Sequence, residues 1–135
     1  MVDVGGKPPL RREAVAEVYF CAAPATLDLV LAGQLPKGEA LAVARVAGIA
    51  AAKRCDQLIP LCHTLPLEVV NVSFERTDPE RLRIETTAAV TARTGVEMEA
   101  LTAAAVAALT LYDMTKAVDR DLRIESLRLL RKTKA

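Results

Sequence analysis

Residues 67–92, LEVVNVSFERTDPERLRIETTAAVTA, contain two extended runs separated by a turn. In the second run, 81–92, apolar or small side chains occupy every second position from Leu82 to Val90. A period of two is typical of a β-strand with one buried face. The first run, 67–76, alternates less regularly, and the turn sequence TDPE lies between the two. The stretch therefore predicts a β-hairpin.

The segments on both sides of the hairpin complete an α+β pattern. They predict a strand at 13–22, a short helix at 26–32, a longer helix at 38–53, a helix at 94–118 and a strand at 122–130. The order is β-α-α-β-β-α-β when the hairpin is included. With the two early helices taken as one crossover, it predicts a ferredoxin-like fold, a four-stranded antiparallel sheet with helices packed on one face. We expect a single domain over residues 1–135.

The helix at 94–118 is rich in alanine, which permits close packing against its neighbours. A capping box is predicted at its start, with Thr94 as N-cap and Glu97 reaching back. Its predicted apolar stripe is Met98, Leu101, Ala105, Ala108, Leu109 and Tyr112.

Composition excludes several classes of protein. The chain has 18 Lys and Arg against 17 Asp and Glu, so its net charge of +1 provides no field for nucleic acid or an anionic membrane. An RNA-binding domain with this element order would carry stacking aromatics on its central strands, whereas those strands here offer Thr, Ala and Arg. Three widely spaced cysteines favour a reducing compartment. The start has no apolar signal segment, so we expect a cytoplasmic protein without a membrane partner.

The sequence offers two places for chemistry. Cys62 and the only histidine, His63, follow an apolar run. Such residues are most often a structural histidine and a small buried thiol. The paired Cys and His spacings of a zinc site are missing. Asp113 and Lys116 lie three apart on the long helix and can form an ion pair. Such pairs are usually solvated, but the stretch LTLYDMTKAV is otherwise largely apolar, which favours an interface or a site. A lysine buried there would shift its pKa and transfer protons.

Glu99 lies on the same helix as Asp113. Fourteen residues separate them, which returns to nearly the same face but about 21 Å along the axis. One compact site within a subunit cannot use both. Two copies of the helix, packed antiparallel across a two-fold axis, would bring them together, so we expect an oligomer with shared sites.

Cations form a third group, in which solvated charge and anion binding are equally good interpretations for any one residue. Lys37 precedes a predicted helix start, where backbone amides favour anions. Further cations, among them Arg12 and Lys132, lie near the ends of the chain. No GxxxxGK[ST] loop or GxGxxG fingerprint is present, so side chains must hold any phosphate.

Two long runs resemble one family. KGEALAVARVAGIAAAKRCDQLIPLCHTLPLEVVNV, from Lys37, and RTGVEMEALTAAAVAALTLYDMTKAVDRD, from Arg93, resemble the signature blocks of the MoaC family, the cyclic pyranopterin monophosphate synthases. The opening MVDVGGK with Arg11-Arg12-Glu13 is similar to the family's opening. The resemblance covers nearly the whole chain. It implies a lyase of molybdenum cofactor biosynthesis that converts a cyclised dihydroguanosine triphosphate, derived from GTP, into cyclic pyranopterin monophosphate and pyrophosphate.

The resemblance also implies an assembly and site residues. It implies a ferredoxin-like fold and a homohexamer, a trimer of dimers with sites at subunit interfaces. Asp113 and Lys116 match the catalytic pair. The matching substrate-binding residues are Leu61, Cys62, His63, Met98, Glu99, Glu97, Lys37, Arg12 and Lys132. No metal ligands or protein-bound cofactor are implied, and Mg²⁺ would be held through the substrate's phosphates.

Two positions depart from the family. Thr64 follows His63 where the family usually has Pro, which bears on the rigidity of that loop. The sequence ends RKTKA, whereas the family usually continues into a Gly/Ser-rich tail, which bears on the role of Lys132. The competing interpretation is a regulatory module on the same fold that binds a nucleotide without catalysis; it leaves the Asp113–Lys116 pair unexplained.

Overall fold

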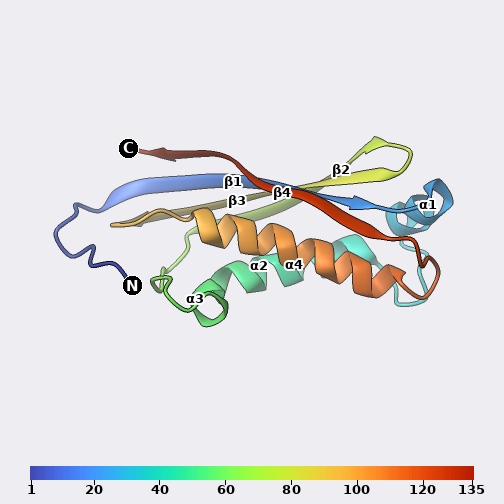
Figure 1. Cartoon of the computed structure of the whole chain (residues 1–135), viewed down its shortest axis with the longest axis horizontal. Helices are drawn as coiled ribbons and strands as arrows, with labels where there is room; N and C mark the ends of the chain where they lie inside the picture. The colour runs from blue at the N-terminus through green and yellow to red at the C-terminus, as the bar shows by residue number, and fades with distance from the viewer.

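A computed structural model describes residues 1–135. The elements are β1 (Leu10–Cys21), α1 (Pro24–Ala32), α2 (Ala40–Lys53), α3 (Cys55–Leu58), β2 (Val69–Asp78), β3 (Arg81–Ala92), α4 (Glu97–Thr115) and β4 (Arg123–Lys134). The four strands form one antiparallel sheet in the order β2-β3-β1-β4. Helices α2 and α4 lie along one face of this sheet (Figure 1). The predicted ferredoxin-like α+β fold is confirmed.

Alternating side chains on the strands build the core. On β1, Ala14, Ala16, Val18 and Phe20 are buried on the side that faces the helices. On β3 the buried positions include Leu82, Ile84, Thr86, Ala88 and Val90, the residues whose period of two predicted the strand. The predicted bounds of this strand, 81–92, agree with the structure. The hairpin is therefore the best-predicted part of the fold.

The predicted apolar stripe of α4 is wrong. Its buried positions are Glu99, Ala100, Thr102, Ala103, Ala104, Ala107, Ala108, Leu111, Met114 and Thr115, so only Ala108 of the predicted stripe is buried. The bulky members Met98, Leu109 and Tyr112 are instead exposed. Because the buried face consists mainly of alanine, the helix can lie close to the sheet and to α2. A Cβ added to Gly48 of α2 would lie 3.0 Å from the Ala103 carbonyl oxygen.

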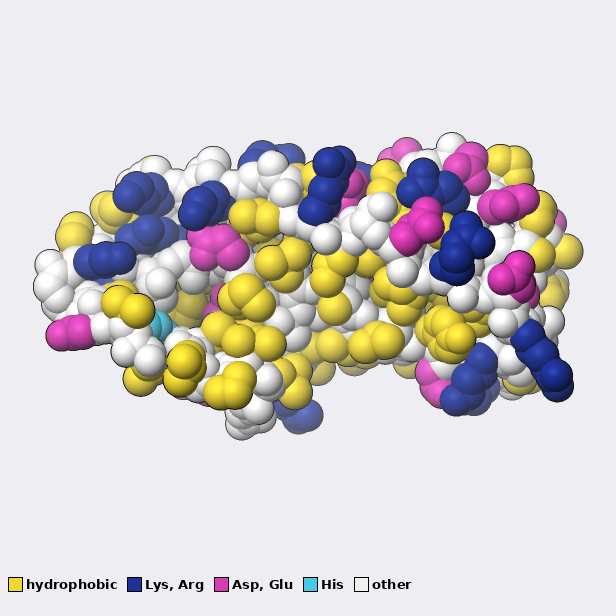
Figure 2. Space-filling model, in the orientation of Figure 1, with side chains coloured by type: hydrophobic (Ala, Val, Ile, Leu, Met, Phe, Trp, Pro, Cys, Tyr) yellow, Lys and Arg dark blue, Asp and Glu magenta, His cyan; other side chains and the backbone are white.

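Several large apolar residues of both helices lie on the surface that points away from the sheet. Leu109 of α4 is 58% exposed and Val46 of α2 is 67% exposed. Figure 2 shows apolar side chains collected over these two helices, with charged side chains along the upper edge and toward the two ends of the molecule. No helix of the structure combines the length and apolarity that a membrane crossing needs.

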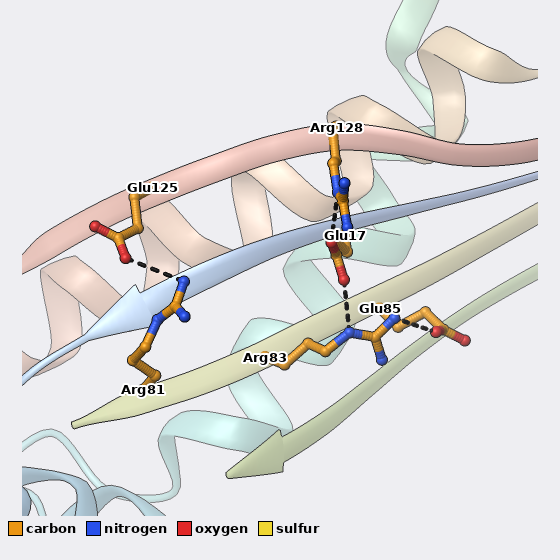
Figure 3. A network of polar contacts seen from close by, with 6 residues as sticks. All are labelled: Glu17, Arg81, Arg83, Glu85, Glu125 and Arg128. Atoms are coloured by element: carbon orange, nitrogen blue, oxygen red, sulfur yellow. Dashed lines mark hydrogen bonds and ion pairs between the residues drawn. The ribbon is translucent and has the colours of Figure 1, made fainter. Parts of the chain in front are cut away.

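A charge cluster centred on the buried Glu17 lies on the other face of the sheet (Figure 3). Glu17 of β1 is 3% exposed and accepts hydrogen bonds from Arg83 of β3 at 2.6 Å and from Arg128 of β4 at 2.7 Å. Arg83 also donates to Glu85 at 2.6 Å. The three strands are thus joined by side chains as well as by their backbone ladders.

Strand β4 pairs irregularly with β1. The register shifts twice, between Val15 and Ala16 and between Glu17 and Tyr19 of β1. At the second shift Ser126 adopts a left-handed backbone with φ of 59°. Each shift adds one residue to β4, which is the mark of a β-bulge.

Candidate functional site

The predicted site residues fall into two groups at opposite ends of α4. The first group, which we call the loop end, lies where α4 begins and contains Leu61, Cys62, His63, Glu97, Met98 and Glu99. The second, the helix end, lies where α4 stops and contains Lys37, Asp113 and Lys116. Arg12 and Lys132 belong to a pocket that adjoins the loop end.

The loop end surrounds a cavity of about 370 Å³. The residues between α3 and β2 supply one wall, with His63 half-buried, and the first turn of α4 supplies the opposite wall. Glu99 is only 4% exposed, and its burial raises the pKa of its carboxyl, to which the nearby charges of Glu97 and Asp56 add. A carboxyl of this kind holds a proton more readily than one in water, which suits an exchange of protons with a ligand.

The predicted capping box at the start of α4 is wrong. The helix begins at Glu97, with Val96 at the N-cap and no side-chain hydrogen bond there. The Glu97 carboxylate instead lies 3.7 Å from the Lys132 amine. Thr94 and Gly95, just before the helix, line the cavity.

A second pocket, of about 200 Å³, shares Gly95 and Glu97 with the cavity and has no apolar lining. Arg12 and Lys132 face it, together with Glu13, Thr133 and Lys134. Arg12 comes from β1 and donates to the Ala92 and Arg93 carbonyls at 3.3 Å. The three cations of this pocket outnumber the carboxylates of Glu13 and Glu97, a balance that suits an anion such as a phosphate.

At the helix end, the Asp113 carboxylate is held between two amines. Lys116 contacts it at 2.8 Å and Lys37 at 2.9 Å, so the predicted pair of Asp113 and Lys116 forms and gains a third member. The two lysines, Lys116 first, lower the pKa of Asp113 to about 2.

The expectation of a buried lysine is wrong for the single chain. Lys116 is 58% exposed, and its hydrogen bond to Asp113 raises its pKa instead of lowering it. The amine therefore stays protonated at neutral pH. Any lowering of its pKa requires a group outside this chain.

The two groups cannot meet within one chain. Glu99 and Asp113 belong to one continuous helix, Glu97–Thr115. Fourteen residues of rise place them about 21 Å apart along its axis. The structure brings Lys37 to Asp113 and Lys132 to Glu97, but it keeps the two ends separate.

Sequence reasoning missed residues that line the loop end. Val2, Val4 and Lys7 of the N-terminal segment face the cavity. Arg93 anchors this segment by donating to the Gly5 carbonyl at 3.0 Å. The segment has no periodicity, so no pattern marks it as part of a wall. No three histidine, cysteine or acidic side chains converge as metal ligands anywhere in the structure.

The amino-acid sequence is similar to a known family over its whole length. The sequence model of the MoaC family matches residues 1–135. A protein of Pelotomaculum thermopropionicum is 58% identical over 135 residues, which is 98% of this chain and 79% of that protein. A protein of Herpetosiphon aurantiacus is 57% identical over 134 residues, covering 98% and 82%. One of Chloroflexus aggregans is 55% identical over 134 residues, covering 98% and 81%. All three are named cyclic pyranopterin monophosphate synthase.

Proposed function

The chain belongs to the MoaC family, and from this premise we infer that it is a cyclic pyranopterin monophosphate synthase, an enzyme of molybdenum cofactor biosynthesis. The proposed substrate is (8S)-3',8-cyclo-7,8-dihydroguanosine 5'-triphosphate, and the products are cyclic pyranopterin monophosphate and pyrophosphate. The reaction class is that of a phosphorus–oxygen lyase. The proposal rests on the match of the family model to residues 1–135. In this chain, the acidic and basic residues that match the family's site gather at the two ends of one helix.

Proton transfers are the first task of the proposed reaction, because a ring must open and a pterin must form. Asp113, with its pKa lowered to about 2, is ionised at neutral pH and can accept a proton. Lys116 stays protonated and can donate one. In the free chain these shifts make Asp113 a weak base and Lys116 a weak acid, so the proposed proton transfers need the substrate or a neighbouring copy to bring the two pKa values closer to neutral.

Closing the cyclic phosphate is the second task. A substrate hydroxyl attacks the α-phosphorus and pyrophosphate leaves, so negative charge grows on the leaving group. We propose that this charge is stabilised by His63 of the loop end, by Arg12 and Lys132 of the adjoining pocket, and by Lys37 of the helix end. Mg²⁺, where it takes part, would be held through the phosphates of the substrate.

We propose that each site joins the loop end of one copy to the helix end of another. The separation of the two ends along α4 supports this, and so does the exposed apolar surface over α2 and α4. A homohexamer, built as a trimer of dimers, is the proposed assembly. We place the protein in the cytoplasm, in keeping with its three unpaired cysteines.

Incubation with the cyclised triphosphate tests the reaction. We expect release of pyrophosphate and a pterin that fluoresces after oxidation. Lys116→Ala should lower turnover about a hundredfold or more, because it removes a general acid. Binding of the triphosphate with no product from the wild-type protein would support the regulatory module instead.

Mixing two inactive variants tests the shared site. Lys116→Ala disables the helix end and His63→Ala the loop end. If two copies pair at random and each site draws on both, about a quarter of the wild-type activity should return in a one-to-one mixture after unfolding and refolding together. Each variant refolded alone is the control. A mixture as inactive as its components would refute the shared site, while the reaction itself would stand on the first assay.

A further inference from the structure

The segment that carries Leu61, Cys62 and His63 has few backbone hydrogen bonds of its own. After α3, the Ile59 N–H donates to the Cys55 carbonyl at 2.8 Å and the Cys62 N–H donates to the Ile59 carbonyl at 3.1 Å. The next backbone hydrogen bonds come just before β2 begins at Val69, from the Leu67 N–H to the Leu65 carbonyl and from the Glu68 N–H to the Ala89 carbonyl, both at 3.0 Å. The cavity wall of the loop end is thus a loop whose position depends on a small number of contacts.

One side-chain contact closes this loop. The Thr64 hydroxyl, next to His63 in sequence, donates to the Asp56 carboxylate at 2.8 Å. Asp56 belongs to α3, which is fixed to the body of the protein because Cys55 is 1% exposed and lies 3.5 Å from the Thr102 hydroxyl of α4. The hydrogen bond therefore ties the end of the loop to an anchored helix.

We propose that Thr64 is a positioning residue, whose hydrogen bond to Asp56 holds the 61–63 loop in the shape that receives the substrate. This role rests on the proposed function, because it concerns the binding of the same triphosphate. Thr64 acts through its neighbours, since it is absent from the cavity lining while Leu61, Cys62 and His63 all face the cavity.

The effect should appear in binding and not in the chemical step. A loop that must be ordered on binding lowers affinity, whereas one held in place beforehand does not. Thr64 is exposed and Asp56 is partly exposed, so the hydrogen bond should contribute no more than a typical bond between neutral groups, less than the range for charged acceptors. We therefore expect its loss to raise KM about fivefold while kcat changes less than about twofold.

Thr64→Val is the main test, because valine keeps the branched shape and removes the hydroxyl. Thr64→Ser should restore KM, since it keeps the donor. The matched control is Thr77→Val, at an exposed strand position where threonine makes no side-chain hydrogen bond. A Thr64→Val protein with unchanged KM, or with a loss in kcat alone, would overturn the proposal.

Asp56→Ala removes the acceptor of the same hydrogen bond and is the second test variant. Asp56 also raises the pKa of Glu99, so its removal has an effect of its own. A double-mutant cycle separates the two: in Asp56→Ala, the further change Thr64→Val should leave KM unchanged within about twofold. Independent effects of the two substitutions on KM would contradict the hydrogen bond as the cause.

Hydrogen exchange on the free protein gives a readout that needs no substrate. Amides of the 59–65 segment should exchange about fivefold faster in Thr64→Val than in wild type or Thr64→Ser. Equal exchange would overturn the proposal even if KM differed. A wild-type protein without synthase activity would refute the proposed function, whereas an active wild type matched by Thr64→Val in KM and exchange would refute the role of Thr64 alone.

Discussion

Replacing Glu17 by glutamine tests how the open face of the sheet is held together. The carboxylate is 3% exposed and receives two hydrogen bonds from arginines on the neighbouring strands, at 2.6 and 2.7 Å. Glutamine keeps the shape and one acceptor oxygen, but it removes the charge and turns an N–H₂ group toward one arginine. The variant therefore changes electrostatics with little change in packing.

The expected cost follows from what the two arginines retain. Breaking a buried ion pair costs about 3–5 kcal/mol when the other partner is left without compensation. Here Arg83 keeps its bond to Glu85, and Arg128 is 66% exposed and can be hydrated. We therefore expect Glu17→Gln to lower the free energy of unfolding by about 2 kcal/mol at neutral pH.

The cost should depend on pH in one direction. Burial alone would raise the pKa of Glu17, but the hydrogen bonds from Arg83 and Arg128 outweigh it and lower the pKa below 4.5. A carboxyl with a lowered folded pKa stabilises the protein above its unfolded value, and this stabilisation is lost as the pH falls through the folded value. The difference between wild type and Glu17→Gln should therefore be full above pH 4.5 and shrink in stronger acid.

Urea unfolding followed by circular dichroism measures these differences, at one fixed protein concentration because association adds stability. Glu85→Gln is the matched control: Glu85 pairs with the same arginine but is 31% exposed, so we expect a cost of about 0.5 kcal/mol. Equal costs for the two variants, or a Glu17 effect that does not change with pH, would refute the reasoning.

Two further substitutions test packing and capping. Asp119 accepts hydrogen bonds from the Thr26 hydroxyl and from a backbone N–H just before α1, so Asp119→Ala should lower the free energy of unfolding by about 1 kcal/mol, measured in urea. Gly48→Val should cost about 3 kcal/mol or more, because even a Cβ there would lie 3.0 Å from the Ala103 carbonyl oxygen. Gly6→Val, where a Cβ meets nothing within 4 Å, is its control, and similar thermal midpoints for these two glycine variants would contradict the close approach of α2 and α4.

Local patterns predicted the strands better than the helix faces. The period of two in residues 81–92 located β3, because alternate side chains there enter a one-sided core. On α4 the same kind of reasoning chose the wrong face. Alanine is common on both faces, so it carries little information about which face is buried, and three bulky residues of the predicted stripe, Met98, Leu109 and Tyr112, point outward. A hydrophobic pattern cannot distinguish a face that meets the sheet from one left exposed by a single chain.

Site residues were predictable where they are close in sequence. Asp113 and Lys116 share a helical face, so their ion pair could be expected. Lys37 lies 76 residues from Asp113, and its contact depends on how α2 is placed against α4. The Thr64–Asp56 bond was not predicted either, because α3 has only four residues and no period marks so short a helix.

The two bulges give β4 two residues more than the segment of β1 with which it pairs. Lys132 lies opposite Ala14, where its amine reaches Glu97. A strand paired without interruption from Glu125, opposite Tyr19, would set Lys132 against Arg12, about two residues or roughly 7 Å further along β1. The two extra residues therefore place Lys132 beside Glu97 at the second pocket, while Lys134 takes the position opposite Arg12, so that both amines of the C-terminal strand line the same polar pocket.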